Sequence, residues 1–192
     1  MKNLIYLAAF ALAVTFASTL AAQDTTTTET TDEAFPVGTD PDLQPGQSYL
    51  LEKHGDWDVV CVKAQSEKDS CHIFQSIKDE TGNPVAEMNL FLLPPGNVAV
   101  AGATVITPLR TLLTAQVVFG IDGGAPKQYP FNWCETQGCV SRVGFTGPEL
   151  DALKSGSEGT LTIQAVDAPG ANISLRVSLS GFTAALAKSI TQ

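Results

Sequence analysis

Four cysteines have the most definite chemistry in this chain: Cys61, Cys71, Cys134 and Cys139. Their spacings of ten and five positions lack the Cys-x-x-Cys pair that is typical of zinc sites and of reactive thiols. In an oxidising compartment, an even number of cysteines indicates disulfides, and four of them allow three pairings. We favour Cys61 with Cys71 and Cys134 with Cys139, because each pair flanks a polar, turn-rich stretch between adjacent strands. The cysteines therefore predict two structural bridges, with no metal site and no cofactor.

The other candidates for catalysis are the two histidines, His54 and His72, and the carboxylates of Asp56 and Asp58. No Gly-x-Ser-x-Gly elbow or comparable nucleophile motif accompanies them in the sequence. Alternation along a strand places both carboxylates toward solvent and the intervening Trp57 in the core. We therefore predict a protein that is not an enzyme, with no catalytic residue assigned. A hydrolase or a thiol enzyme stays open as an alternative.

The elements that must position these residues are predicted to be short strands. Segments rich in β-branched and aromatic residues alternate with Gly, Pro, Asn and Asp, a pattern typical of antiparallel strands. In the last segment, Ile173, Leu175 and Val177 alternate with polar residues, which predicts a strand with one buried face and one face exposed to solvent. The predicted strands cover residues 57–63, 71–77, 85–92, 98–106, 116–121, 129–133, 139–145, 160–166 and 173–179.

Two short helices complete the predicted domain. The first begins at Pro148, a residue favoured in the first turn of a helix, and ends near Gly156. The second covers the Ala-rich residues 183–190. Many short strands with few helices favour an all-β fold: a mostly antiparallel β-sandwich with one or two short helices. A closed barrel is the alternative fold.

Composition divides the chain into three parts. Residues 1–22 carry a positive start, an apolar run and small residues before a cleavage position, as a secretory signal peptide does. Residues 23–48 are rich in Thr, Pro and acids, too polar to form a core, and are predicted to be a disordered linker. Residues 49–192 are predicted to form one disulfide-stapled β-sandwich domain.

The charge of the chain excludes two classes of partner. With 20 acidic and 11 basic residues the formal charge is −9, so we expect no nucleic-acid partner, since binding its phosphates requires a basic surface. The same balance disfavours attachment to anionic lipid. After cleavage of the signal, no stable membrane span is expected.

Several motifs in a fixed order resemble those of the invasion-associated locus B family of exported bacterial proteins. They extend from about position 54 to position 186, almost the whole predicted domain. The motifs are Trp57-Asp58-Val59-Val60-Cys61, Cys71-His72-Ile73-Phe74-Gln75, Thr107-Pro108-Leu109, Ile121-Asp122-Gly123-Gly124, Pro130-Phe131, Cys134, Gly138-Cys139-Val140 and Ser180-Gly181-Phe182-Thr183-Ala184-Ala185-Leu186. The resemblance implies an envelope-associated β-sandwich with paired cysteines and no catalytic residues.

These observations predict a periplasmic protein, or one associated with the outer surface or secreted, that serves cell-envelope function or binds a protein. The expected partner is an envelope or host protein of unknown identity, and the oligomeric state is not predicted. A periplasmic carrier of a small molecule or lipid is the alternative function, because the interior of a sandwich or barrel can hold a ligand.

Overall fold

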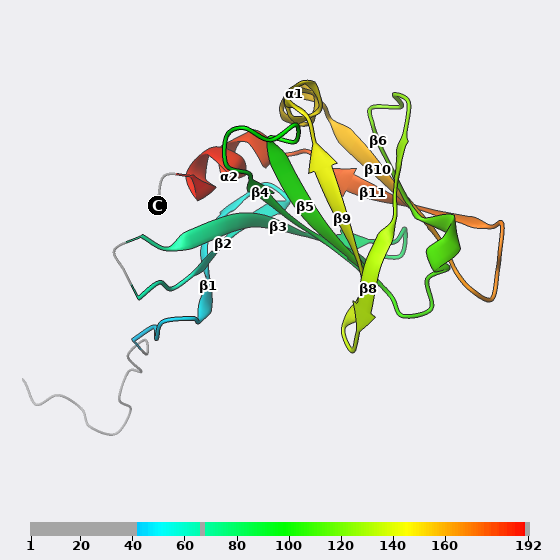
Figure 1. Cartoon of the computed structure of the whole chain (residues 1–192), viewed down its shortest axis with the longest axis horizontal. Coiled ribbons are helices and arrows are strands. Elements are labelled where there is room, and N and C mark those ends of the chain that lie inside the picture. The colour runs from blue at the N-terminus through cyan, green and yellow to red at the C-terminus, as the bar shows by residue number, and fades with distance from the viewer. Residues whose placement is uncertain (1–41, 66–67, 191–192) are drawn as a thin grey trace, which may run out of the picture. The chain divides into compact units, whose positions relative to one another are not determined.

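The structure is a computed structural model that describes residues 42–65 and 68–190. Within these ranges, strands are far more frequent than helices (Figure 1). The strands are β1 (Ser48–His54), β2 (Trp57–Val62), β3 (Ser70–Lys78), β4 (Pro84–Leu92), β5 (Ala101–Thr107), β6 (Val117–Ile121), β7 (Lys127–Tyr129), β8 (Phe131–Glu135), β9 (Gly138–Phe145), β10 (Glu158–Gln164) and β11 (Asn172–Ser178). The helices are α1 (Gly147–Ser155), α2 (Phe182–Ser189) and a 3-10 turn over Leu113–Ala115.

The strands form two sheets. The larger sheet has seven strands in the order β1-β2-β3-β4-β5-β9-β8, and the smaller has four in the order β11-β10-β6-β7. Every pairing between neighbouring strands is antiparallel. Because the two ladders end at separate edge strands, the fold is a sandwich rather than a closed barrel. The predicted all-β, mostly antiparallel fold with short helices is confirmed.

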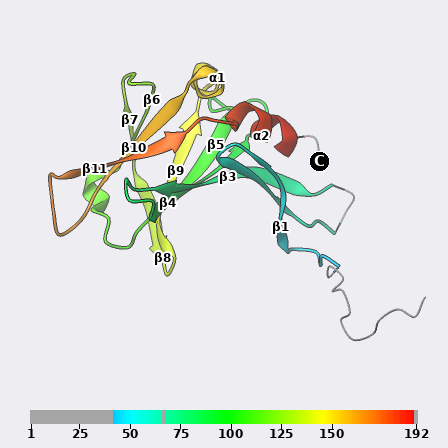
Figure 2. The same cartoon turned by 180° about the vertical axis from the view of Figure 1, so that it is seen from behind.

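One hydrophobic core joins the two sheets. Its members come from the inward faces of both, including Trp57 and Val105 of the larger sheet and Leu161 and Val177 of the smaller. Helix α2 adds Phe182, whose ring meets Trp57 edge to face at a centroid distance of 5.3 Å. In Figures 1 and 2, which view the molecule from opposite sides, α2 lies beside β1 and β3. The prediction that Trp57 is buried is confirmed, since the residue is 0% exposed.

One predicted strand is divided in the structure, and one strand was missed. Residues 129–133 form no single strand, because Pro130, which has no N–H, separates β7 from β8. The two pieces belong to different sheets: β7 pairs with β6, and β8 pairs with β9. Strand β1 was not predicted at all, since Tyr49, Leu50 and Leu51 are consecutive apolar residues without alternation.

Backbone pairing of the domain extends to residues before the predicted boundary at residue 49. The N–H of Gly46 donates to the carbonyl of Lys63 at 2.7 Å, and the N–H of Lys63 donates to the carbonyl of Gln47 at 2.8 Å. These bonds extend the β1–β2 pairing into the end of the predicted linker. The predicted signal peptide and the linker up to residue 41 lie outside the described residues. Within the described ranges, no helix has the length and apolar character needed to cross a bilayer.

Candidate functional site

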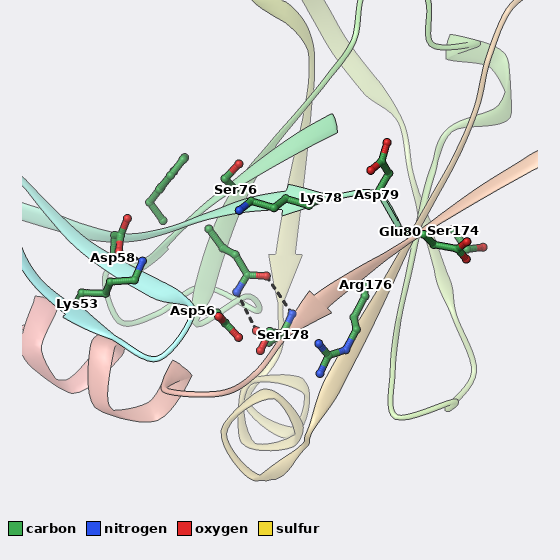
Figure 3. A pocket seen from close by; sticks show the side chains of 12 residues that line it. Lys53, Asp56, Asp58, Ser76, Lys78, Asp79, Glu80, Ser174, Arg176 and Ser178 are labelled. Carbon is green, nitrogen blue, oxygen red and sulfur yellow. Dashed lines mark hydrogen bonds and ion pairs between the residues drawn. The ribbon is translucent and has the colours of Figure 1, made fainter. Parts of the chain in front are cut away.

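A polar groove of about 560 Å³ opens where β3 and the β1–β2 hairpin face β11 (Figure 3). In the figure, Lys53 and Asp58 stand at one end of the groove and Glu80 and Ser174 at the other. The larger sheet supplies most of the lining, and the smaller sheet supplies residues of its edge strand. The lining residues are Lys53, Asp56, Asp58, Phe74, Gln75, Ser76, Lys78, Asp79, Glu80, Ser174, Arg176 and Ser178.

The floor of the groove is fixed by a buried amide. Gln75 is 4% exposed, and its Nε2 donates to the carbonyl of Ser178 at 2.9 Å. The backbone N–H of Ser178 donates back to Oε1 of Gln75, also at 2.9 Å. Trp57 donates its Nε1–H to the same carbonyl at 2.8 Å. These three bonds hold the end of β11 against the larger sheet.

The same bonds reveal which backbone groups of β11 face the groove. In an antiparallel pair, residues alternate between those that bond to the neighbouring strand and those whose N–H and C=O point away from it. Because Ser178 bonds to Gln75 on the side away from β10, Arg176 and Ser174 present their N–H and C=O to that side as well. Their register partners on β10 are Thr160 and Thr162. Strand β11 is therefore an open edge with its hydrogen-bonding groups turned toward the groove.

The charged side chains of the groove fall into two groups. Ion pairs occupy some of them: Lys53 with Asp58 at 2.8 Å, and Arg176 with Glu158. The carboxylate of Asp79 accepts bonds within its own turn. The pKa of Asp79 is lowered first by the bond from the Thr81 hydroxyl, then by that from the N–H of Asn83 and, to a lesser extent, by that from the N–H of Thr81.

The charged side chains of the second group have no partner in the described structure. Among the described residues, Asp56, Lys78 and Glu80 have neither a hydrogen-bond partner nor an ion-pair partner for their side chains. Asp56 lies in the turn that joins β1 to β2, and Glu80 follows the end of β3. The groove thus offers two carboxylates and one ammonium to a ligand.

The four cysteines lie apart from the groove floor, in two cross-strand bridges. Cys61 is bonded to Cys71 between β2 and β3, and Cys134 is bonded to Cys139 between β8 and β9. These are the pairs that the sequence spacing favours, and every cysteine is bonded. Each bridge closes one hairpin of the larger sheet, as structural bridges do.

A carboxylate supports the hairpin that carries the first bridge. Asp69 accepts bonds from the N–H of Ala64 at 2.9 Å and from the hydroxyl of Tyr49 at 2.7 Å. The Ala64 bond first, and then the Tyr49 bond and the nearby Lys63, hold the pKa of Asp69 below its ordinary value. The hydrogen bond to Asp69 in turn raises the pKa of the Tyr49 hydroxyl. This cluster ties β1 to the base of the β2–β3 loop.

The two histidines do not form a nucleophile–base arrangement with the cysteines, all of which are bonded to one another. His72 lies on β3 opposite Val60, where burial lowers its pKa and a hydrogen bond with Asn89 opposes that effect. His54 ends β1, with its Nε2 3.3 Å from a carboxylate oxygen of Glu52. Both contacts are with neighbours in the larger sheet, and the buried Nε2 of His54 has no hydrogen-bond partner within the described part of the chain.

Sequence reasoning missed the groove, although one signal for it was present. Gln75 stands between Ile73 and Ile77 on the inward face of a strand, and a buried amide requires hydrogen-bond partners. That requirement pointed to a polar site beneath β3. It did not identify Ser178, which is 103 positions away along the chain.

Comparison with known proteins places this architecture in a family. Residues 57–189 match the family described as invasion associated locus B (IalB) protein. The chain belongs to this family. It is 33% identical over 147 residues to an invasion protein B homolog of Brucella abortus (strain 2308), covering 75% of this chain and 81% of the relative. The homolog from Brucella abortus biovar 1 (strain 9-941) matches with the same identity and coverage.

A solved structure of the IalB type has the same fold. The crystal structure of invasion associated protein b from Bartonella henselae superposes with a TM-score of 0.63 and 26% sequence identity. The match covers 74% of this chain and 95% of that chain. The resemblance inferred from the ordered motifs is therefore confirmed. Two disulfides together with IalB membership indicate a protein that works outside the cytoplasm.

Proposed function

We propose that this IalB-family chain is an exported module of the cell envelope that binds another protein and catalyses no reaction. The observation that carries the proposal is the open edge of β11, whose unpaired backbone groups face a groove with unpartnered charges. Exposed strand edges are sites at which a second polypeptide binds. The two bridges and the cluster around Asp69 cross-link strands of the larger sheet, which supplies most of the groove.

A surface site suits the packing of the domain better than an internal one. The space between the sheets is occupied by large side chains, among which Trp57, Phe145 and Phe182 are each at most 1% exposed. A lipid or small-molecule carrier needs an interior cavity for its ligand. We therefore place the binding function on the groove at the surface.

Mass spectrometry of the chain isolated from its native envelope tests the export half of the proposal. We expect loss of about the first 22 residues and the bridges Cys61–Cys71 and Cys134–Cys139 in non-reduced peptide maps. A retained N-terminus with four free thiols would contradict export, because such thiols are typical of the cytoplasm.

Photo-cross-linking in living cells tests the binding half. A photoreactive residue in place of Lys78 should form one discrete adduct with an envelope protein, and the same residue in place of Gln128, exposed on the smaller sheet, should not. The identified protein is then purified and mixed with the full chain to reproduce the adduct. Equal labelling from both positions, or no complex between the purified proteins, would count against a binding module.

A further inference from the structure

We propose that the groove binds an extended peptide segment of a partner protein, which adds as a new strand along β11. The inference rests on the proposed binding function and specifies its site and the form of its ligand. Only an extended backbone supplies N–H and C=O groups at the repeat of a strand edge, so the unpaired groups of Ser174 and Arg176 select this class of ligand.

The edges of the two sheets differ in how well they are protected. Bulges and very short strands are the usual devices that prevent pairing at an edge. In the larger sheet, the register of β1 shifts between Leu50 and Glu52, and that of β8 shifts between Phe131 and Trp133. In the smaller sheet, β7 has three residues. Three of the four edges are thus protected.

Strand β11 lacks these protections. It has seven residues, and its register with β10 runs without a shift from Asn172 to Ser178. The Gln75 amide already bonds to the edge at Ser178, as a strand backbone would do. That amide closes one end of the edge and leaves the Ser174–Arg176 portion open for a peptide.

The opposite wall of the groove also has unpaired backbone. Strand β3 continues to Lys78, whereas its described pairing with β2 ends at Phe74, opposite Asp58. The last residues of β3 therefore have no strand neighbour on the β2 side, where Ser76 and Lys78 line the groove. A peptide strand in the groove lies between β11 and this end of β3.

The unpartnered charges define the side chains of the peptide. Asp56 and Glu80 belong to opposite ends of the groove wall, at the β1–β2 turn and just past the end of β3. Lys78 is the last residue of β3, two positions before Glu80, and its side chain extends toward Ser76 in Figure 3. Opposite charges across an interface favour binding and fix register. We therefore assign to the groove an extended, proline-free peptide with basic side chains toward its two ends, where they face Asp56 and Glu80.

The test is selection of peptides from a random display library on the full, oxidised chain, followed by synthesis of the enriched sequences. We expect enriched peptides with basic ends, whose binding shifts the backbone amide NMR signals of Ser174 and Arg176. Methylation of alternate backbone nitrogens in a selected peptide should abolish binding, because it removes the N–H groups that pair with β11. Failure to enrich any peptide that perturbs these amides would overturn the proposal.

Matched variants of the protein separate edge pairing from other modes of binding. Ser174→Pro removes one groove-facing N–H but leaves the neighbouring bonds to β10 in place, since Pro is tolerated at the open side of an edge strand. It should weaken the selected peptides at least about fivefold. Ser174→Ala retains the N–H and should bind as the wild type does. Glu80→Lys should weaken peptides with basic ends while the fold is retained.

The possible outcomes distinguish strand addition at β11 from protein binding in general. Peptides that bind equally well to Ser174→Pro and Ser174→Ala would overturn strand addition at β11 and leave protein binding through another surface. Loss of a self-associated form in Ser174→Pro, measured by analytical ultracentrifugation, would make a second copy of the chain the occupant and would also overturn the proposal. Absence of any envelope partner in the cross-linking experiment would instead contradict the binding function itself.

Discussion

The side chain of Gln75 takes the place of a neighbouring strand beside Ser178. Its amide both donates to and accepts from the Ser178 backbone, each bond at 2.9 Å, although 103 positions separate the two residues. The Trp57 indole shares the same carbonyl. This contact joins the edge of the smaller sheet to the inward face of the larger one, and it sets the end of the groove that we assign to a peptide.

Replacement of Gln75 by Ala should destabilise the domain. The change leaves the buried N–H of Ser178 without an acceptor and opens a cavity, so the free energy of unfolding should fall by about 1–3 kcal/mol. Urea titration followed by tryptophan fluorescence measures this loss. Gln128→Ala is the matched control, because Gln128 is exposed on β7. Equal stability of the two variants would show that the Gln75 bonds contribute nothing.

Gly181 should tolerate no side chain. Its φ is +83°, and an added Cβ would lie 2.1 Å from the carbonyl oxygen of His54. Gly170 has almost the same φ, +85°, but nothing within 4 Å of that position. Gly170→Ala should therefore cost only about 1 kcal/mol of backbone strain, whereas Gly181→Ala should prevent α2 from docking and lower Tm far more. Similar Tm values for the two variants would refute the proposed close approach.

Asp122 should support stability at neutral pH and lose that role in acid. Bonds from the N–H of Glu158 first, and then from the hydroxyl and N–H of Ser157, lower the pKa of Asp122 below its ordinary value of 3.8. A group with a lowered native pKa contributes fully above its unfolded pKa, and the contribution disappears as the pH falls through the native value. The Tm of the wild type should therefore fall between neutral pH and pH 3. The Tm of Asp122→Asn should fall less over the same range.

The control for this pH profile is Asp151→Asn, because the Asp151 side chain is 78% exposed on α1. This variant should follow the wild-type profile and keep the wild-type Tm at neutral pH. Asp122→Asn should already have a lower Tm at neutral pH, since an amide accepts the bonds of residues 157–158 less strongly. Parallel pH profiles for wild type and Asp122→Asn would argue against the role of this carboxylate.

The two bridges should differ in their contribution to stability. Cys61 belongs to the core cluster and Cys71 packs against it, whereas Cys134 is exposed and Cys139, although buried, is not part of that cluster. Removal of either bridge should cost up to about 2–3 kcal/mol through the greater freedom of the unfolded chain. The Cys61→Ala/Cys71→Ala pair also loses core packing, so its urea midpoint should be the lower of the two double variants. The opposite order would show that core packing at Cys61 is not decisive.

Local pattern predicted much of the fold. The alternation of Ile173, Leu175 and Val177 with polar residues indicated a half-buried strand, and Leu175 and Val177 are in the core, whereas Ile173 is 38% exposed. Pro148 correctly indicated the first turn of α1. Such features depend on near neighbours in the sequence, so they are readable before any tertiary contact is known.

The groove was not predictable in the same way. It combines the β1–β2 turn and β3 with residues from the far end of the chain, and neither segment shows which strand is an edge. The unpredicted β1 illustrates the difficulty, because Leu50 is exposed on an edge strand where no alternation is enforced. Strand order is set by packing between sheets, and only the structure reveals that β11 is left open.

Amide hydrogen exchange of the free, full-length chain tests the openness of β11 most directly. The N–H groups of Ser174 and Arg176 should exchange rapidly, while those of Leu175 and Val177, which face β10, should be strongly protected. Uniform protection along residues 172–178 would mean that the edge is already covered, and it would contradict a groove available to a partner peptide.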